Sequence, residues 1–177
     1  MLPPVTGITT INIRVNPKVP RVEFIGPSRR IIIAWRYAYS FHPLFSDLRR
    51  LDLSTIEHLR VSGLDCNDND PLRQILPPMQ NLRTLSLSGN SLIYSLGFHA
   101  TPSVVVCPNL EELTIDFPGH TRSKISIEGA MRVVEPMALA WAKLKTINIF
   151  APWWRLDPGD LPEFKERAWS VCIMASS

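Results

Sequence analysis

The chain has 177 residues, of which 45% are hydrophobic and 20% charged, a composition typical of a globular protein and not of a disordered one. The 16 prolines exclude a bundle of long helices, because proline disrupts helix interiors, and no apolar run approaches the roughly 18 residues of a membrane span. The net charge of +3 comes without a basic stripe, so we expect neither a nucleic-acid nor a membrane partner.

One apolar pattern recurs along the chain. An apolar residue is followed three and five positions later by two more, and this happens at residues 8–13, 56–61, 82–87, 110–115 and 144–149. Residues 82–90 extend it to L-x-x-L-x-L-x-x-N, the signature of a leucine-rich repeat. From Leu59 through Leu85 and Leu113 to Ile147, the middle residues are 26, 28 and 34 positions apart, and the last interval implies an insertion.

The pattern has a direct structural meaning. Alternation puts the last two apolar residues on one face of a short strand, and a single unit cannot bury that face alone. We therefore predict an α/β fold, a leucine-rich-repeat-like curved parallel sheet with short helices or turns on the convex side. A single domain would span 1–177, with a C-terminal cap over 151–177 and units centred near 11, 33, 59, 85, 113 and 147.

Two stretches near the N-terminus allow more than one placement of a strand. The 48 residues between Ile11 and Leu59 leave room for two units, and the strand-like stretch 29–35 is predicted to supply the missing one. Leu48, Leu51 and Leu53 also fit the repeat pattern but overlap the match at 56–61. We favour a strand at 57–62, because that stretch alternates and is ended by Gly63.

The segments between the strands predict short helices and loops. Residues 71–76 read as a helical turn, 128–142 as an amphipathic helix interrupted by Pro136, and 160–167 as a further helix. The final stretch, 168–174, reads as a terminal strand or cap. Loops are predicted at 64–70, 89–109, 117–124 and 151–160.

Several stretches resemble the C-terminal region of the F-box/leucine-rich-repeat proteins of mushroom-forming fungi. The most telling is CPNLEEL at 107–113, and the resemblance also covers IGPSRRIIIAWRY, LSTIEHLRVSG, PLRQILPPMQNLRTLSLSGN and MALAWAKLKTINIF, within residues 20–173. It implies a protein-recognition module that acts as the substrate-binding part of an SCF-type ubiquitin-ligase receptor.

Members of that family begin with an F-box, a short helical segment that docks the ligase adaptor. The few residues before Ile8 are too short to hold one, so we expect the adaptor as a partner only if an F-box lies upstream. The alternative is a truncated or diverged structural fragment with no ligase role.

Catalytic and metal-binding patterns are absent from the sequence. Residues 65–70 begin like a calcium loop, but Asp70 stands where the turn needs glycine and Leu76 where a bidentate glutamate is needed. The four histidines and three cysteines lack metal-ligand spacing, and no nucleophile motif or phosphate-binding glycine loop occurs. We expect no enzyme activity, no cofactor and no metal, and a small enzyme is the less favoured alternative.

The cysteines and the N-terminal residues bear on the cellular location of the protein. Three scattered cysteines and no visible secretory signal favour an intracellular location, cytoplasmic or nuclear.

The candidate site follows from the strand alternation. Residues that flank the inward apolar positions point away from the core and would line the concave face of a solenoid. We predict that an unidentified protein target binds there, and the alternative is a solvated face with no ligand. The candidate residues are His58, Arg60, Ser62, Thr84, Ser86, Ser88, Glu112, Thr114, Asp116, Thr146 and Asn148, with Phe150 and, from the first strand, Thr10, Asn12 and Arg14.

Two adjacent tryptophans, Trp153 and Trp154, form the one apolar cluster in a predicted loop. They could anchor a partner, because tryptophan is enriched at binding hot spots. We favour the other interpretation, in which both rings cover the end of the sheet and cap the core.

Overall fold

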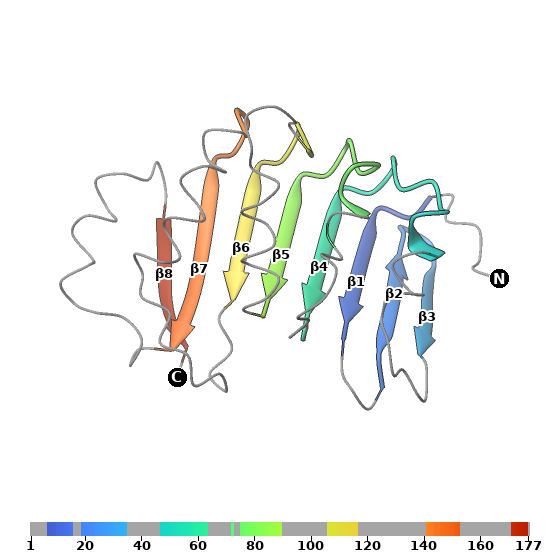
Figure 1. Cartoon of the computed structure of the whole chain (residues 1–177), viewed down its shortest axis with the longest axis horizontal. Helices are drawn as coiled ribbons and strands as arrows, with labels where there is room; N and C mark the ends of the chain where they lie inside the picture. The colour runs from blue at the N-terminus through green and yellow to red at the C-terminus, as the bar shows by residue number, and fades with distance from the viewer. Residues whose placement is uncertain are drawn as a thin grey trace.

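The computed structural model describes residues 7–15, 19–34, 47–63, 72, 75–89, 106–116, 141–152 and 171–176. These residues form a single mixed β-sheet in the order β3-β2-β1-β4-β5-β6-β7-β8 (Figure 1). From β1 to β8, each new parallel strand is added on the same side of the one before it. The strands are β1 (Thr10–Arg14), β2 (Arg21–Ile25), β3 (Arg30–Ala34), β4 (His58–Ser62), β5 (Thr84–Ser88), β6 (Glu112–Asp116), β7 (Thr146–Pro152) and β8 (Val171–Ser176).

The repeat pattern predicts the register of the central strands. The middle apolar residues Ile11, Leu59, Leu85, Leu113 and Ile147 are direct partners across β1, β4, β5, β6 and β7, all parallel. The choice of 57–62 over the overlapping frame is confirmed, because β4 begins at His58 while Leu48 is helical and buried.

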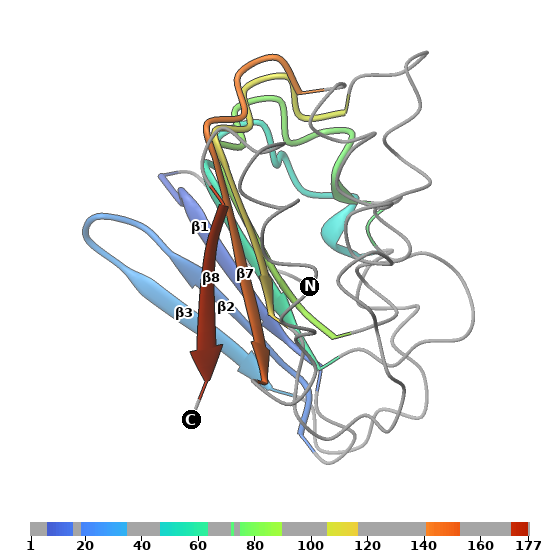
Figure 2. The same ribbon diagram turned by 90° about the vertical axis from the view of Figure 1, so that its left-hand side faces the viewer.

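The core lies on one face of this sheet. The two inward residues of each central strand are buried, and so is the apolar residue that opens each unit, namely Ile8, Ile56, Leu82, Leu110 and Leu144. Burying one such side chain stabilises the fold by about 1.5–3 kcal/mol. A single unit contributes too few of these side chains to be stable by itself, so the fold depends on the stacking of units. The described segments that precede β4, β5, β6 and β7 lie on this face, while the β2–β3 turn lies at the edge of the sheet (Figure 2).

The connections between strands repeat the same backbone hydrogen bonds. Ahead of each strand the N–H of Ile56, Leu82, Leu110 or Leu144 donates to the carbonyl three residues earlier. The carbonyl just after this residue accepts two N–H groups from the next unit: the Glu57 oxygen, for example, binds the N–H groups of Arg83 and Thr84 at 2.8 and 3.0 Å. These bonds satisfy buried backbone groups and fix the spacing between units.

The N-terminal part of the sheet corrects the prediction of an all-parallel sheet. Residues 29–35 do contain a strand, β3, but it does not lie between β1 and β4, which pair directly. Instead β2 and β3 form an antiparallel hairpin, and β2 pairs antiparallel with β1. The unit centred near 33 is therefore an edge strand and not a parallel repeat. Its turn is closed by the N–H of Gly26, which donates to the Arg29 carbonyl at 2.9 Å.

The C-terminal part also differs from the prediction. Strand β7 runs through Pro152, so the predicted loop cannot begin at residue 151. The predicted terminal strand is confirmed as β8, and it continues the parallel sheet. Val171 pairs with Ile147 and Ile173 with Ile149, 24 residues apart in each case, so β8 follows the apolar frame of the preceding units.

The predicted helices are described only in small part. Leu72 and Ile75 are helical, and the N–H of Leu76 donates to the Leu72 carbonyl at 2.9 Å, consistent with the helical turn at 71–76. Residues 141–142, the end of the predicted helix 128–142, are not helical; residues 128–140, the helix at 160–167 and the loops at 64–70 and 117–124 lie outside the described residues. In the described part of the chain no helix has the length and apolarity needed to cross a membrane.

Candidate protein-binding face

The predicted site residues all lie on the face of the sheet opposite the core, here called the open face. Cross-strand pairing arranges them in three rows that run across β1, β4, β5, β6 and β7. The first row is Thr10, His58, Thr84, Glu112 and Thr146; the middle row is Asn12, Arg60, Ser86, Thr114 and Asn148; the last row is Arg14, Ser62, Ser88, Asp116 and Phe150. None of these side chains is fully buried, so all can meet a partner.

Hydrogen bonds within the rows fix some of these side chains in place. His58 Nδ1 lies 2.7 Å from the Thr84 hydroxyl on the neighbouring strand. The amide nitrogen of Asn148 donates to Glu112 at 2.8 Å and to the Thr114 hydroxyl at 3.4 Å. Glu112 is therefore already engaged by its neighbour, and Asp116 is the less restrained carboxylate of β6.

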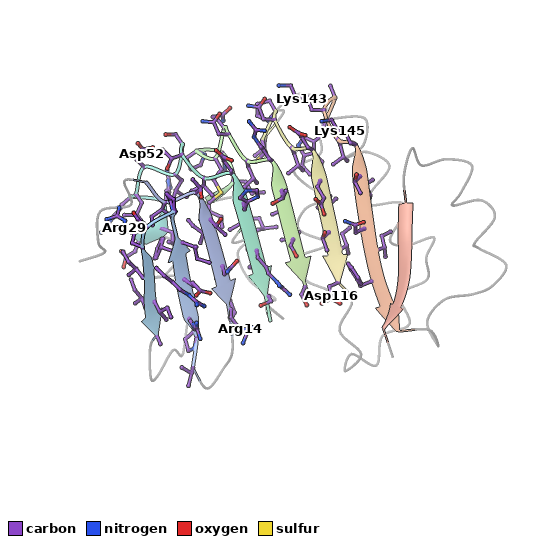
Figure 3. The ribbon with its side chains drawn as sticks, turned by 180° about the vertical axis from the view of Figure 1, so that it is seen from behind. Arg14, Arg29, Asp52, Asp116, Lys143 and Lys145 are labelled. Atoms are coloured by element: carbon purple, nitrogen blue, oxygen red, sulfur yellow. The ribbon has the colours of Figure 1, made fainter. Side chains whose placement is uncertain are left out.

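The last row carries two opposite charges that are not paired with each other. Arg14 and Asp116 lie at the same end of the sheet (Figure 3), at the carboxyl ends of β1 and β6. Three strand intervals separate them, which corresponds to about 14 Å. Neither side chain makes an ion pair or hydrogen bond with another described residue, and Ser62 and Ser88 lie between them. Arg60 in the middle row is likewise exposed and free of such contacts among the described residues.

A buried carboxylate on the open face was not predicted from the sequence. Glu23 of β2 is only 8% exposed and sits between Asn12 of β1 and Ile32 of β3 in the cross-strand register. Arg30 donates to its Oε1, Asn12 donates to Oε2 at 3.3 Å, and Arg21 lies 3.6 Å from Oε1. The hydrogen bond from Arg30 is the main reason that the pKa of Glu23 is lowered, although partial desolvation opposes it.

The Glu23→Gln variant is expected to lose about 1 kcal/mol of stability at neutral pH, because Arg21 and Arg30 lose their anionic partner. A lowered folded-state pKa contributes stability that is present above the unfolded value and lost as pH falls through the folded pKa. The gap between wild type and variant should therefore narrow below about pH 4.5, the usual value for glutamate. Urea unfolding at a series of pH values measures this. Glu57→Gln, which removes a carboxylate without an ion-pair partner among the described residues, is the control, and a gap independent of pH would contradict the prediction.

The rim where the parallel strands begin carries charges of alternating sign. Glu57, Arg83, Glu111 and Lys145 occupy the same position in successive units, just before β4, β5, β6 and β7. Lys145 lies 2.7 Å from Glu111 and Arg83 lies 3.8 Å from it. The Lys145 hydrogen bond, with the charges of the neighbouring cations, lowers the pKa of Glu111. Because their side chains are exposed to solvent, these ion pairs contribute little stability each.

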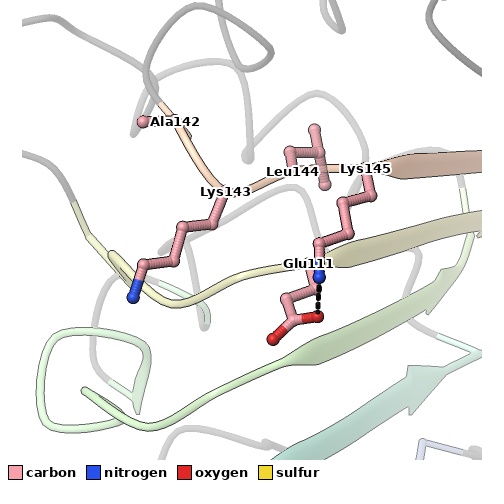
Figure 4. Close-up of a pocket in the computed structure, with 5 residues that line it drawn as sticks. All are labelled: Glu111, Ala142, Lys143, Leu144 and Lys145. Carbon is pink, nitrogen blue, oxygen red and sulfur yellow. Dashed lines mark hydrogen bonds and ion pairs between the residues drawn. The ribbon is translucent and has the colours of Figure 1, made fainter.

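The same rim holds a pocket whose charged side chains are already engaged. It is lined by Glu111 and by residues 142–145 (Figure 4). Both of its ammonium groups have partners, because Lys145 binds Glu111 and Lys143 donates to the side-chain oxygen of Asn109. The charged side chains that line the pocket are therefore bound either to each other or to the neighbouring Asn109.

The remaining chemical candidates fall mostly outside the described residues. Cys107 is buried, and burial raises the pKa of its thiol to about 12, so this cysteine packs as a small apolar side chain. Residues 65–70, Trp153 and Trp154 are not among the described residues. Within the described part, no cluster of three or more His, Cys, Asp or Glu side chains could hold a metal ion.

Comparison with protein-family models, with curated proteins and with solved structures finds no match to this chain.

Proposed function

We propose that the chain is a leucine-rich-repeat solenoid whose open face binds a segment of another protein. We also propose that the sheet is curved so that the open face is concave, and that short helices or turns lie on the convex side. Support comes from the register, since one apolar frame aligns six parallel strands from β1 to β8. Stacked units of this kind build an extended binding surface.

The observation that carries the proposal is the open face itself. It presents three rows of mostly polar side chains on strands, while the described segments that precede β4, β5, β6 and β7 lie on the opposite side (Figure 2). Side chains held on strands are positioned more accurately than side chains on loops. A face of this kind suits recognition of another macromolecule better than catalysis, because the polar groups are spread along the sheet and do not converge in a pocket.

The order of charges indicates what kind of segment would fit. Arg14 and Arg60 lie on β1 and β4, hydroxyl side chains follow on β5, and Asp116 lies on β6. A polypeptide that crosses the strands would place an acidic residue near the arginines and a basic residue near Asp116. The two would be about 10–14 Å apart, which is three to four residues of an extended chain.

The role in ubiquitin ligation is proposed from the resemblance to F-box receptors, above all from residues 107–113. In that role the open face would hold the substrate, and the adaptor would bind an F-box joined to the chain. The test is co-purification of the adaptor with and without such a segment. Adaptor recovery that does not depend on the segment would contradict this division of labour.

The test of the binding face is a double charge reversal, Glu112→Lys with Asp116→Lys. Peptides selected from a displayed random library on the wild-type protein are the probe, and we expect the variant to bind them at least about tenfold more weakly. Asp47→Lys with Glu57→Lys makes the same change in net charge away from the open face and should leave their affinity unchanged. Selected peptides that bind the open-face variant as tightly as wild type would exclude Glu112 and Asp116 from the site.

A further inference from the structure

The outer edge of β3 is the feature that the proposed binding face does not use. Strand β3 is the last strand at its end of the sheet, and no described strand pairs with its outer side. Its sequence, RIIIA, combines high strand propensity with an apolar centre and has neither proline nor lysine. Natural edge strands usually carry proline or lysine, which prevent pairing with another chain.

Apolar exposure in the described part of the chain is concentrated around this hairpin. The large hydrophobic side chains that are exposed there are Val19, at 50%, and Ile32, at 49%. Ile32 is the central residue of the edge strand and lies on the open face, in register with Glu23. Ile31 and Ile33 point to the core side and are only partly buried.

The hydrogen-bond pattern of the hairpin shows which backbone groups face outward. The N–H of Gly26 donates to the Arg29 carbonyl, so residues 26 and 29 form a hydrogen-bonded pair at the turn. Hydrogen-bonded and non-hydrogen-bonded pairs alternate along an antiparallel ladder, so Ile31 and Ile33 bond to β2. The N–H and carbonyl groups of Arg30, Ile32 and Ala34 therefore point away from β2, toward the open edge.

We propose that β3 pairs antiparallel with β3 of a second copy of this chain, about a two-fold axis at Ile32. In this register Ile32 faces Ile32 of the second copy, and Arg30 faces Ala34 of the second copy. All three residues whose groups point outward then form hydrogen-bonded pairs with the other copy. The two sheets join into one continuous sheet.

The side chains of the strand fit this register. Each arginine meets an alanine, so no like charges oppose each other across the new ladder. The half-exposed Ile32 side chains cover one another on the open face. On the core side, Ile31 lies opposite Ile33 of the second copy, which completes the burial of both. An isologous contact of this kind closes after two copies, so it yields a dimer and not a fibre.

A site-specific disulfide tests the register. In a hydrogen-bonded antiparallel pair the Cα atoms are about 5.5 Å apart, a separation that a disulfide spans. Ile32→Cys should therefore give a covalent dimer on mild oxidation. Ala34→Cys is the control and should not, because the two residues 34 lie four positions out of register. The native cysteines are assessed with wild-type protein on the same non-reducing gel. A covalent dimer from Ala34→Cys equal to that from Ile32→Cys would overturn the register.

Sedimentation equilibrium tests the dimer itself. Wild-type protein should sediment with twice the mass of one chain at high concentration, and Ile32→Lys should reduce the association at least about tenfold. Val19→Lys, the same change at an equally exposed site outside the edge strand, should leave it unchanged. Ala34→Glu places a carboxylate opposite Arg30 and should strengthen the dimer, while Ala34→Arg should weaken it. A monomeric wild type, or a dimer that none of the edge variants affects, would overturn the proposal.

Discussion

The Trp141→Ala variant is expected to lose about 3–5 kcal/mol of unfolding free energy, a large share of the 5–15 kcal/mol typical of a domain. Trp141 is only 2% exposed and is among the largest fully buried side chains described. Its indole N–H donates to the Val106 carbonyl at 2.6 Å, and its own carbonyl accepts the N–H of Leu144. The variant leaves a cavity and an unsatisfied carbonyl between the connections that precede β6 and β7.

A second variant at this position separates the two contributions. Trp141→Phe keeps most of the apolar volume but cannot donate to Val106, so we expect a smaller loss, mostly the about 1–3 kcal/mol of an unsatisfied buried acceptor. Urea unfolding followed by far-ultraviolet circular dichroism measures both variants. A loss below about 1 kcal/mol for Trp141→Ala would mean that the connections before β6 and β7 do not share one core.

The strands that the sequence predicted well are those in which one signal determines both position and register. In β4, β5, β6 and β7 the apolar frame marks the buried face, and the same frame aligns each strand with its neighbour. The hairpin was harder, because β2 and β3 do not follow that frame. A signal was present in the alternation of Arg21, Val22, Glu23 and Phe24 before a Gly-Pro turn, which is typical of a hairpin.

The candidate site was predictable as a face but not in its details. Strand alternation alone determines which side chains share a face, and the three rows follow from it once the register is known. The two-residue alternation of a strand does not determine which side chains contact each other. The bond from Asn148 to Glu112 joins residues 36 positions apart, and the burial of Glu23 depends on Arg30, which the hairpin brings beside it. Neither the Asn148–Glu112 bond nor the burial of Glu23 can be inferred until the pairing of the strands is known.

The Gly63→Ala variant is the second change with a large expected effect, about 2–5 kcal/mol of destabilisation. Gly63 follows β4 with a φ of 83°, a conformation that costs an L-residue about 1–2 kcal/mol. An added Cβ would also lie 2.3 Å from the Val15 carbonyl oxygen, which is backbone and cannot rotate away. The N–H of Gly63 is held by the Ser88 carbonyl, and that of Val15 by the Ser62 carbonyl, so β1 and β5 both restrict the shift that relief would need.

Gly7→Ala is the matched control for this prediction. Gly7 has a φ of 75°, so the conformational cost is similar, but no atom lies within 4 Å of an added Cβ. We expect Gly7→Ala to lose only about 1–2 kcal/mol in the same urea unfolding experiment. Equal losses for the two variants would mean that β1 moves away from β4 at little cost. In that case Arg14 and Ser62, which are paired at this end of the ladder, would not be held at a fixed spacing. The last row of the open face would then adapt to a bound segment, and the spacing of its charges would not select that segment.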